Sequence, residues 1–106
     1  MLHPVAIRHL QKAERYQAAG DLLRAAQHCE KAVRIAPNFA IAHANLGSLL
    51  LAQGHYAQGI KACIQALRLQ PLNDTAHRNL VTALHKLGQH SEAATVALKS
   101  VQLLPA

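Results

Sequence analysis

The sequence predicts an all-α protein, an α-solenoid of three helix–turn–helix units with six antiparallel helices. The first observation behind this prediction is that the chain overlays on itself when it is shifted by 34 residues. A fixed period of this length is typical of stacked supersecondary units rather than of one globular core. The residues that coincide include Pro37, Pro71 and Pro105, then Gly20, Gly54 and Gly88, then His9, His43 and His77.

The spacing of apolar residues within each unit predicts two helices. In the middle unit Leu46, Leu49 and Leu50 recur at three- and four-residue steps, which is the helical period. Gly54 permits a tight turn after the first helix, and Pro71 ends the second because proline cannot continue the hydrogen-bond ladder. The expected helices span residues 4–19, 22–35, 40–53, 56–69, 75–87 and 90–103, in units of about 6–39, 40–73 and 74–106.

Two residues mark the expected starts of helices. Pro4 suits a first helical turn, where its missing N–H costs nothing. Asp74 is expected to cap the fifth helix, because an acidic side chain there suits the helix dipole. Residues 1–106 are therefore read as one domain of three units, and we expect it to be the front of a longer protein.

The composition favours closely packed helices and gives no sign of a membrane protein. Apolar residues make up 51% of the chain but aromatic residues only 3%, so small side chains such as Ala supply most of the packing. No apolar run approaches the ~20 residues that cross a bilayer. The N-terminus lacks the basic start and apolar stretch of a signal peptide. We therefore expect a cytoplasmic protein without a membrane partner.

The chain is basic, with a net charge of +6. Its eleven Lys and Arg residues are scattered rather than clustered, and few aromatic side chains are present for stacking on bases. We therefore favour a solvated basic surface over a nucleic-acid groove. A surface that binds an acidic protein partner ranks between these two interpretations. Nucleic-acid binding would show as affinity that falls steeply with salt.

The repeated residues resemble the tetratricopeptide repeat (TPR), whose 34-residue unit carries W-x2-L-G-x2-Y, then A-x3-F, then Pro. The resemblance covers roughly residues 6–106. It implies a right-handed superhelix that binds partners. Among members of the family, the chain resembles the TPR arrays of bacterial proteins and of proteins like O-linked N-acetylglucosamine transferase. The matching residues are Tyr16, Ala25 and Pro37 in the first unit, Leu46, Gly47 and Pro71 in the second, and Leu80, Ala93 and Pro105 in the third.

Several packing positions hold smaller residues than the family pattern. The position of the usual Trp is His in all three units, and that of the later Phe is Cys29, Cys63 and Ala97. Gly59 stands where Ala is expected. These smaller residues predict either tighter helix pairs or a lower stability per repeat. The two cysteines lie one repeat apart, too far for a disulfide, and are expected to be buried thiols.

Catalytic and metal-binding chemistry finds no support in the sequence. The repeated histidines lie one unit apart, a spacing that aligns them without making them converge on one ion. The chain has five carboxylates and lacks a phosphate-binding loop or a nucleophile elbow. We expect neither an enzyme, a metal site nor a cofactor.

The resemblance implies that the first helix of each unit lines an inner groove. We expect this groove to bind an extended peptide or a partner helix. The candidate binding residues are Gln11, Glu14, Asn45, Ser48, Arg78, Asn79, Thr82 and Lys86.

Two groups of residues along this groove bear on the identity of the ligand. Relatives that grip the carboxylate of chaperone tails use Lys, Asn and Arg at positions where this chain has Leu10, Glu14, Asn45, Thr75 and Asn79. Only Asn45 matches, so chaperone-tail binding is not expected.

Gln11, Asn45 and Asn79 share one repeat position and resemble the asparagine ladder that holds a peptide backbone in O-linked N-acetylglucosamine transferases. A side-chain amide offers both a donor and an acceptor to a peptide bond. The alternative is that these amides are structural.

Arg78, His85 and Lys86 make the third-unit end of the groove basic, which favours a ligand with its acidic part there.

The last unit presents a candidate surface for self-association. By repeat position Ala94 and Val101 should pack against a following helix, and Leu104 is uncovered too. More protein or a second copy of the chain would cover this apolar end. The favoured function is a protein-interaction module. The alternative is the substrate-recruiting region of a larger enzyme such as a glycosyltransferase.

Overall fold

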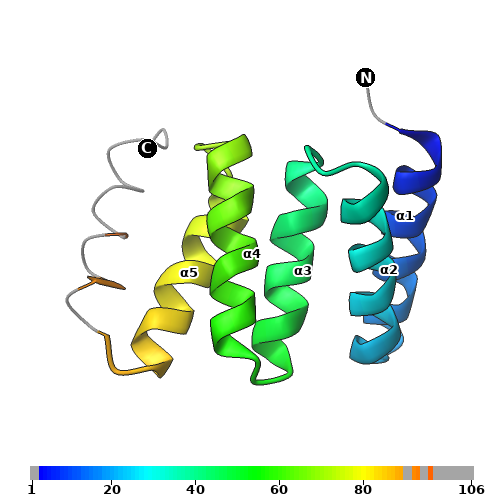
Figure 1. Ribbon diagram of the computed structural model, residues 1–106. Coiled ribbons are helices and arrows are strands. Elements are labelled where there is room, and N and C mark those ends of the chain that lie inside the picture. The colour runs from blue at the N-terminus through cyan, green and yellow to red at the C-terminus, as the bar shows by residue number, and fades with distance from the viewer. Residues whose placement is uncertain (1–2, 90–91, 94–95, 97–106) are drawn as a thin grey trace.

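The computed structural model describes residues 3–89, 92, 93 and 96, and within them every regular element is an α-helix (Figure 1). The prediction of an all-α solenoid is confirmed. The sixth expected helix lies mostly outside the described residues, as do Ala94, Val101 and Leu104 of the predicted self-association surface. The helices are α1 (Pro4–Ala18), α2 (Leu22–Ile35), α3 (Ala40–Ala52), α4 (Tyr56–Leu69) and α5 (Asp74–Lys86).

The glycines and caps predicted from the sequence set the helix ends. Gly20 and Gly54 adopt φ of 81° and 84°, the left-handed conformation that ends a helix and that other residues avoid. Pro4 begins α1, and the Asp21 carboxylate accepts a hydrogen bond from the Arg24 N–H at the start of α2.

The predicted cap of α5 was wrong by one residue. Asn73, not Asp74, is the cap: its side-chain oxygen accepts from the Ala76 N–H at 2.9 Å. Asn and Asp both serve as helix caps, so residue type alone does not decide between two neighbouring candidates. The backbone conformation at Asn73 and Asp74 decides which of them is the cap. Asp74 lies in the first turn of the helix instead and pairs with Arg78.

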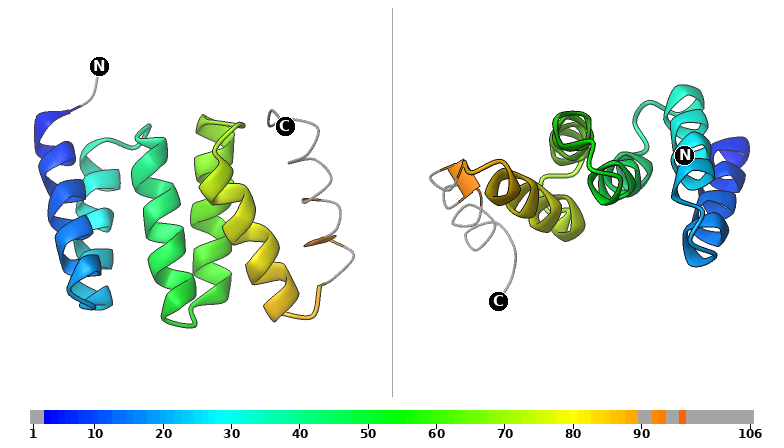
Figure 2. Two further views of the ribbon diagram at one scale, coloured as in Figure 1. Left: turned by 180° about the vertical axis from the view of Figure 1, so that it is seen from behind. Right: turned by 90° about the horizontal axis from the view of Figure 1, so that it is seen from below.

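Each helix packs against the next one along the chain, and α3 also packs against α5 (Figure 2). The buried residues form two clusters. One joins α1 and α2 to α3, and the other joins α3, α4 and α5. Cys29 and Cys63 are both fully buried, as predicted, one in each cluster. The small buried side chains let the helices lie close together.

Two glycines allow the closest approach between α3 and α4. A Cβ atom on Gly47 would lie 2.7 Å from the Cys63 Sγ atom and 3.2 Å from the Gly59 carbonyl oxygen. A Cβ on Gly59 would lie 2.6 Å from Leu51 Cδ2. The second helix pair is therefore tight at the position where the family pattern has Ala.

None of the helices in the described part of the chain has both the length and the apolar character needed to cross a membrane.

Candidate functional site

The eight candidate binding residues lie on the first helix of each unit, and we call the surface that carries them the candidate binding face. On α1, Gln11 and Glu14 are exposed. On α3, Asn45 and Ser48 are half-buried. On α5, Asn79 is half-buried, whereas the remaining three are exposed: Arg78, Thr82 and Lys86.

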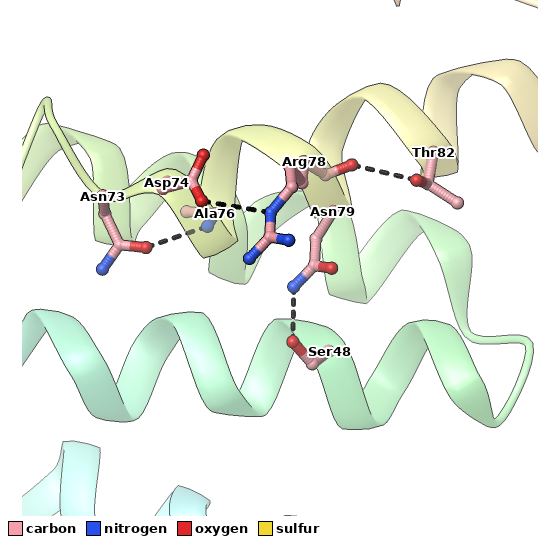
Figure 3. Close-up of polar contacts among 7 residues, drawn as sticks. All are labelled: Ser48, Asn73, Asp74, Ala76, Arg78, Asn79 and Thr82. Carbon is pink, nitrogen blue, oxygen red and sulfur yellow. Dashed lines mark hydrogen bonds and ion pairs between the residues drawn. The ribbon is translucent and has the colours of Figure 1, made fainter. Parts of the chain in front are cut away.

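The structure brings Ser48 and Asn79 together across the α3–α5 junction (Figure 3). The Asn79 amide Nδ2 donates to the Ser48 hydroxyl, and that hydroxyl donates to the Ala44 carbonyl oxygen at 3.3 Å. The chain from Asn79 through Ser48 to the α3 backbone fixes the orientation of both side chains. Within the part of the chain that the structure describes, the Asn79 side chain makes this one hydrogen bond, so its carbonyl oxygen and second N–H have no partner there.

The other two members of the predicted amide ladder are not bonded in this way. Neither Gln11 nor Asn45 has a side-chain hydrogen bond within the described residues. Asn45 lies one repeat before Asn79, and Glu14 lies one repeat before Ser48. Glu14 and Asn45 form no hydrogen bond with each other. The ladder therefore contains one anchored amide and two unanchored ones.

Arg78 is less free than the sequence suggested. Its Nε atom lies 3.2 Å from Asp74 Oδ2, and the two side chains are 72% and 60% exposed (Figure 3). Thr82 donates its hydroxyl hydrogen to the Arg78 carbonyl oxygen at 3.0 Å. The Asp–Arg pair was missed, although the i, i+4 spacing of opposite charges was its visible signal. Asp74 thus offsets part of the positive charge expected at this end of the face.

Two of the repeated histidines hold the turns between units. The Nε2 of His43 donates to the Pro37 carbonyl oxygen at 2.9 Å, and that of His77 donates to the Pro71 carbonyl oxygen at 2.8 Å. His77 is only 5% exposed. The signal for these bonds was the constant six-residue spacing from Pro to His. In the second and third units, the histidine that replaces the usual Trp therefore ties the unit to the turn before it.

His9 has no proline six residues before it and is bonded differently. Its Nδ1 lies 3.0 Å from Nδ1 of His28 on α2, and the His28 ring stacks on Tyr16 with centroids 5.4 Å apart. Partial burial, then the charge of Lys31, lowers the pKa of both histidines below the usual value. No pattern in the sequence pointed to this pair, because it depends on how α1 faces α2.

The remaining chemistry of the described residues is that of a buried, unreactive interior. No three His, Cys, Asp or Glu side chains in this part of the chain converge where they could hold a metal ion. Burial raises the pKa of Cys29 to about 12, with a further contribution from Glu14 and Glu30. Burial likewise raises the pKa of Cys63 to about 11. Both thiols therefore stay protonated at neutral pH and are poor nucleophiles.

Comparison with solved structures places this architecture among TPR arrays. The second TPR of Spaghetti (RPAP3), solved with the HSP90 peptide SRMEEVD, superposes with a TM-score of 0.90 at 23% identity over 94% of this chain and 93% of that one. The TPR2B domain of yeast Sti1, in complex with a pHsp70 peptide, gives 0.90 at 17% identity over 92% and 78%. MamA gives 0.88 at 21% identity over 92% and 57%. At these identities the likeness concerns the fold.

Comparison of the sequence alone agrees. No curated protein matches the chain. Two family models do, both described as tetratricopeptide repeat, one over residues 16–63 and the other over residues 44–106. The chain belongs to the tetratricopeptide repeat family.

Proposed function

We propose that residues 1–106 act as one protein-interaction module that binds an extended peptide or a partner helix along the candidate binding face. The observation that carries this proposal is the anchored Asn79 amide beside the unanchored Asn45 amide. The Asn79 side chain is already held in one orientation, so ligand binding loses less conformational entropy there. The Asn45 side chain gains a hydrogen-bond partner when a peptide binds.

Apolar contacts must supply most of the affinity. Each amide–peptide hydrogen bond contributes only about 1 kcal/mol, whereas micromolar binding requires about 8 kcal/mol. Ile41 lies at the start of α3, one turn before Asn45, and is 49% exposed. Burying such a side chain under a ligand contributes about 1.5–3 kcal/mol. The ligand we propose therefore has apolar side chains as well as an extended backbone.

The structural relatives support a peptide ligand as a class but not a chaperone tail. The Spaghetti repeat and the Sti1 domain were solved with HSP90 and Hsp70 peptides. In this chain Glu14 would repel a terminal carboxylate, and Leu10 and Thr75 stand where basic residues would be needed. We propose a ligand whose acidic part lies beside α5, near Arg78 and Lys86.

Binding of a library of extended peptides, measured by fluorescence anisotropy, tests the proposal. Replacing the amides in Gln11→Ala, Asn45→Ala and Asn79→Ala together should weaken the selected peptides roughly tenfold, which is the loss of one to two net hydrogen bonds. Gln27→Ala, an exposed amide on α2, is the matched control and should leave affinity unchanged. Equal binding by the triple variant and the parent would contradict the proposal.

A second role fits the same amide ladder. As the substrate-recruiting region of a larger enzyme such as a glycosyltransferase, the face would hold substrate peptides for a catalytic domain elsewhere. A nucleotide-sugar-binding domain in the same protein, with turnover of protein substrates lowered by the triple amide variant, would support this role.

A further inference from the structure

The end face of the first unit carries basic residues where the later units carry buried apolar ones. This surface belongs to α1 and α2 and borders the candidate binding face, since Arg15 lies one turn after Gln11 on α1. In the second and third units the same positions lie in the core of the solenoid. The aligned residues are Lys12 with Leu46 and Leu80, and Arg15 with Leu49 and Ala83.

These residues line a pocket between α1 and α2. Its volume is about 400 Å³, and its walls are Lys12, Arg15, Tyr16, Ala19 and His28. His28 replaces an apolar side chain too, since Ala62 holds the equivalent, buried place in the second unit. Three independent positions of one face are thus basic here and apolar in the second unit.

The positive charges of the pocket are uncompensated within the described residues. Lys12, Arg15 and Lys31 make no ion pair there. Asp21, at the start of α2, is already paired with Arg24 at 3.6 Å. A polar face that served only to keep an array end hydrated would be satisfied by acidic residues as well as basic ones, whereas this one is basic at all three positions.

The pocket floor is held in place by ring contacts. His28 stacks on Tyr16 with an interplanar angle of 12°, and its Nδ1 atom shares a hydrogen bond with Nδ1 of His9. One of these nitrogens must donate and the other accept. The Arg24 guanidinium lies 5.8 Å from the centre of the Tyr16 ring on the same surface. A flat aromatic floor surrounded by cations suits a chain with carboxylates at its edges and methylene groups between them.

We infer that this pocket is a second binding site, one that takes an acidic peptide segment with several Asp or Glu side chains. The two lysine and arginine side chains of the pocket wall, Lys12 and Arg15, lie three residues apart on α1, and the Arg24 guanidinium of α2 lies over the Tyr16 ring. Cations spread along the surface in this way favour several carboxylates over a single phosphate. Such a segment would bind across α1 and α2 of the first unit, beside the candidate binding face. The site therefore does not depend on the proposed function.

The histidine pair adds a pH dependence to this site. Its charged surroundings are Arg8 and Lys12 on α1 and Lys31 on α2. Partial burial lowers the pKa of His9 and of His28, and the charges of these neighbours, with His9 itself acting on His28, lower it further, so the neutral form of both rings is favoured at pH 7. A bound carboxylate favours protonation of one ring of the pair, because the Nδ1–Nδ1 hydrogen bond needs the other ring as acceptor. Affinity for an acidic peptide should therefore rise as the pH falls below about 6.5, while Glu side chains stay ionised down to about 4.3.

A fluorescein-labelled peptide of eight glutamates is the probe, and fluorescence anisotropy gives its affinity. Lys12→Glu with Arg15→Glu should weaken binding roughly tenfold, because two exposed ion pairs are replaced by repulsions. The matched control is Lys61→Glu with Arg68→Glu, two exposed positions of α4 that change the net charge equally. It should lose much less affinity. Equal losses in the two double variants would overturn the site, because general charge attraction would then suffice.

Four further measurements test the histidine pair and distinguish an acidic-peptide site at this pocket from a phosphate site, a nucleic-acid site or the candidate binding face. His9→Gln with His28→Gln should abolish most of the rise in affinity between about pH 7.5 and about pH 5.5, while circular dichroism checks that the variant is folded. A rise that persists would overturn the role of the pair. Arg78→Glu with Lys86→Glu removes the exposed cations of the candidate binding face and should cost much less affinity for the glutamate peptide than Lys12→Glu with Arg15→Glu. Displacement of the peptide by millimolar inorganic phosphate, or tighter binding of duplex DNA through Lys12 and Arg15, would overturn the peptide assignment.

Discussion

The first and second units share a backbone plan but differ where their helices meet other helices. In the first unit Ala13 and Ala25 fill the crossing of the helix pair, and both are buried. In the second unit the equivalent residues are Gly47 and Gly59, and the helices approach too closely for added Cβ atoms. A repeat can therefore keep its fold while its internal spacing is set by one or two side chains.

The junctions between units differ in the same way. The α3 and α5 helices pack directly and are bridged by Asn79 and Ser48. Direct contacts between α1 and α3 are sparse, and Glu14 stands where the bridging serine would be. The third-unit side of the candidate binding face is thus fixed, and the first-unit side is open. Binding would order the open side and leave the fixed side unchanged.

The largest effect should come from closing the glycine contact. Gly47→Ala places a Cβ atom 2.7 Å from Cys63 Sγ, inside a fully buried site that cannot yield. Overpacking of this kind costs about 1–3 kcal/mol, only partly offset by the ~1 kcal/mol gain in helix propensity. Urea unfolding should therefore show a lower free energy of unfolding. Gly59→Ala should cost less, because the atom it meets belongs to the half-buried, flexible side chain of Leu51.

The reverse change in the first unit is the matched control. Ala13→Gly should also destabilise, by about 0.5–1 kcal/mol, because glycine loses more backbone entropy on folding. A Gly47→Ala variant more stable than the parent would show that the two helix pairs have the same spacing, and the comparison would fail.

The bridge between α3 and α5 should contribute less. Ser48→Ala removes the hydroxyl that accepts from Asn79, and the amide can turn to solvent because it is only half-buried. We expect a loss of about 0.5–1.5 kcal/mol in the free energy of unfolding. Hydrogen exchange at α5 should become faster while exchange at α1 stays the same. Unchanged exchange at α5 would mean that packing alone holds the junction.

Helix positions could be predicted from the sequence because their signals are local. Residues 40–53 were expected as a helix and Ala40–Ala52 is observed, since Gly54 acts on the adjacent turn. The cap at Asn73 was not separable from Asp74 by residue type. Burial of Cys29 and Cys63 followed from repeat position alone.

The contacts of the candidate site were less predictable because they depend on distances between helices. The bridge from Asn79 to Ser48 joins residues 31 apart in sequence, and the His9–His28 bond joins residues 19 apart. No local pattern fixes such distances. The bonds from His43 and His77 to proline carbonyl oxygens lie six residues apart and could have been found from the repeat.

A serine introduced at position 14 tests whether the α1–α3 junction lacks a bridge only because one side chain differs. Glu14→Ser gives α1 the residue that α3 has at this position, opposite Asn45. If the α1–α3 spacing permits a bond, the free energy of unfolding should rise by about 0.5–1 kcal/mol. An unchanged free energy of unfolding would indicate that α1 and α3 are too far apart for the bond. The two junctions would then differ in helix spacing and not only in one side chain. Gln11→Ser on the same helix is the control, since it introduces a hydroxyl at another repeat position.

The smallest effect concerns the Asp74–Arg78 pair at the fixed side of the face. Asp74→Asn removes an exposed i, i+4 ion pair and should cost only about 0.3–0.5 kcal/mol of stability. Its effect on binding should be opposite in sign, because Arg78 is released from its intramolecular partner. An acidic peptide on the candidate binding face should bind the variant more tightly than the parent, and Arg78→Glu should bind it less tightly. If Asp74→Asn left the affinity unchanged while Arg78→Glu lowered it, Arg78 would already be free in solution, and the two sides of the face would differ in bridging but not in charge.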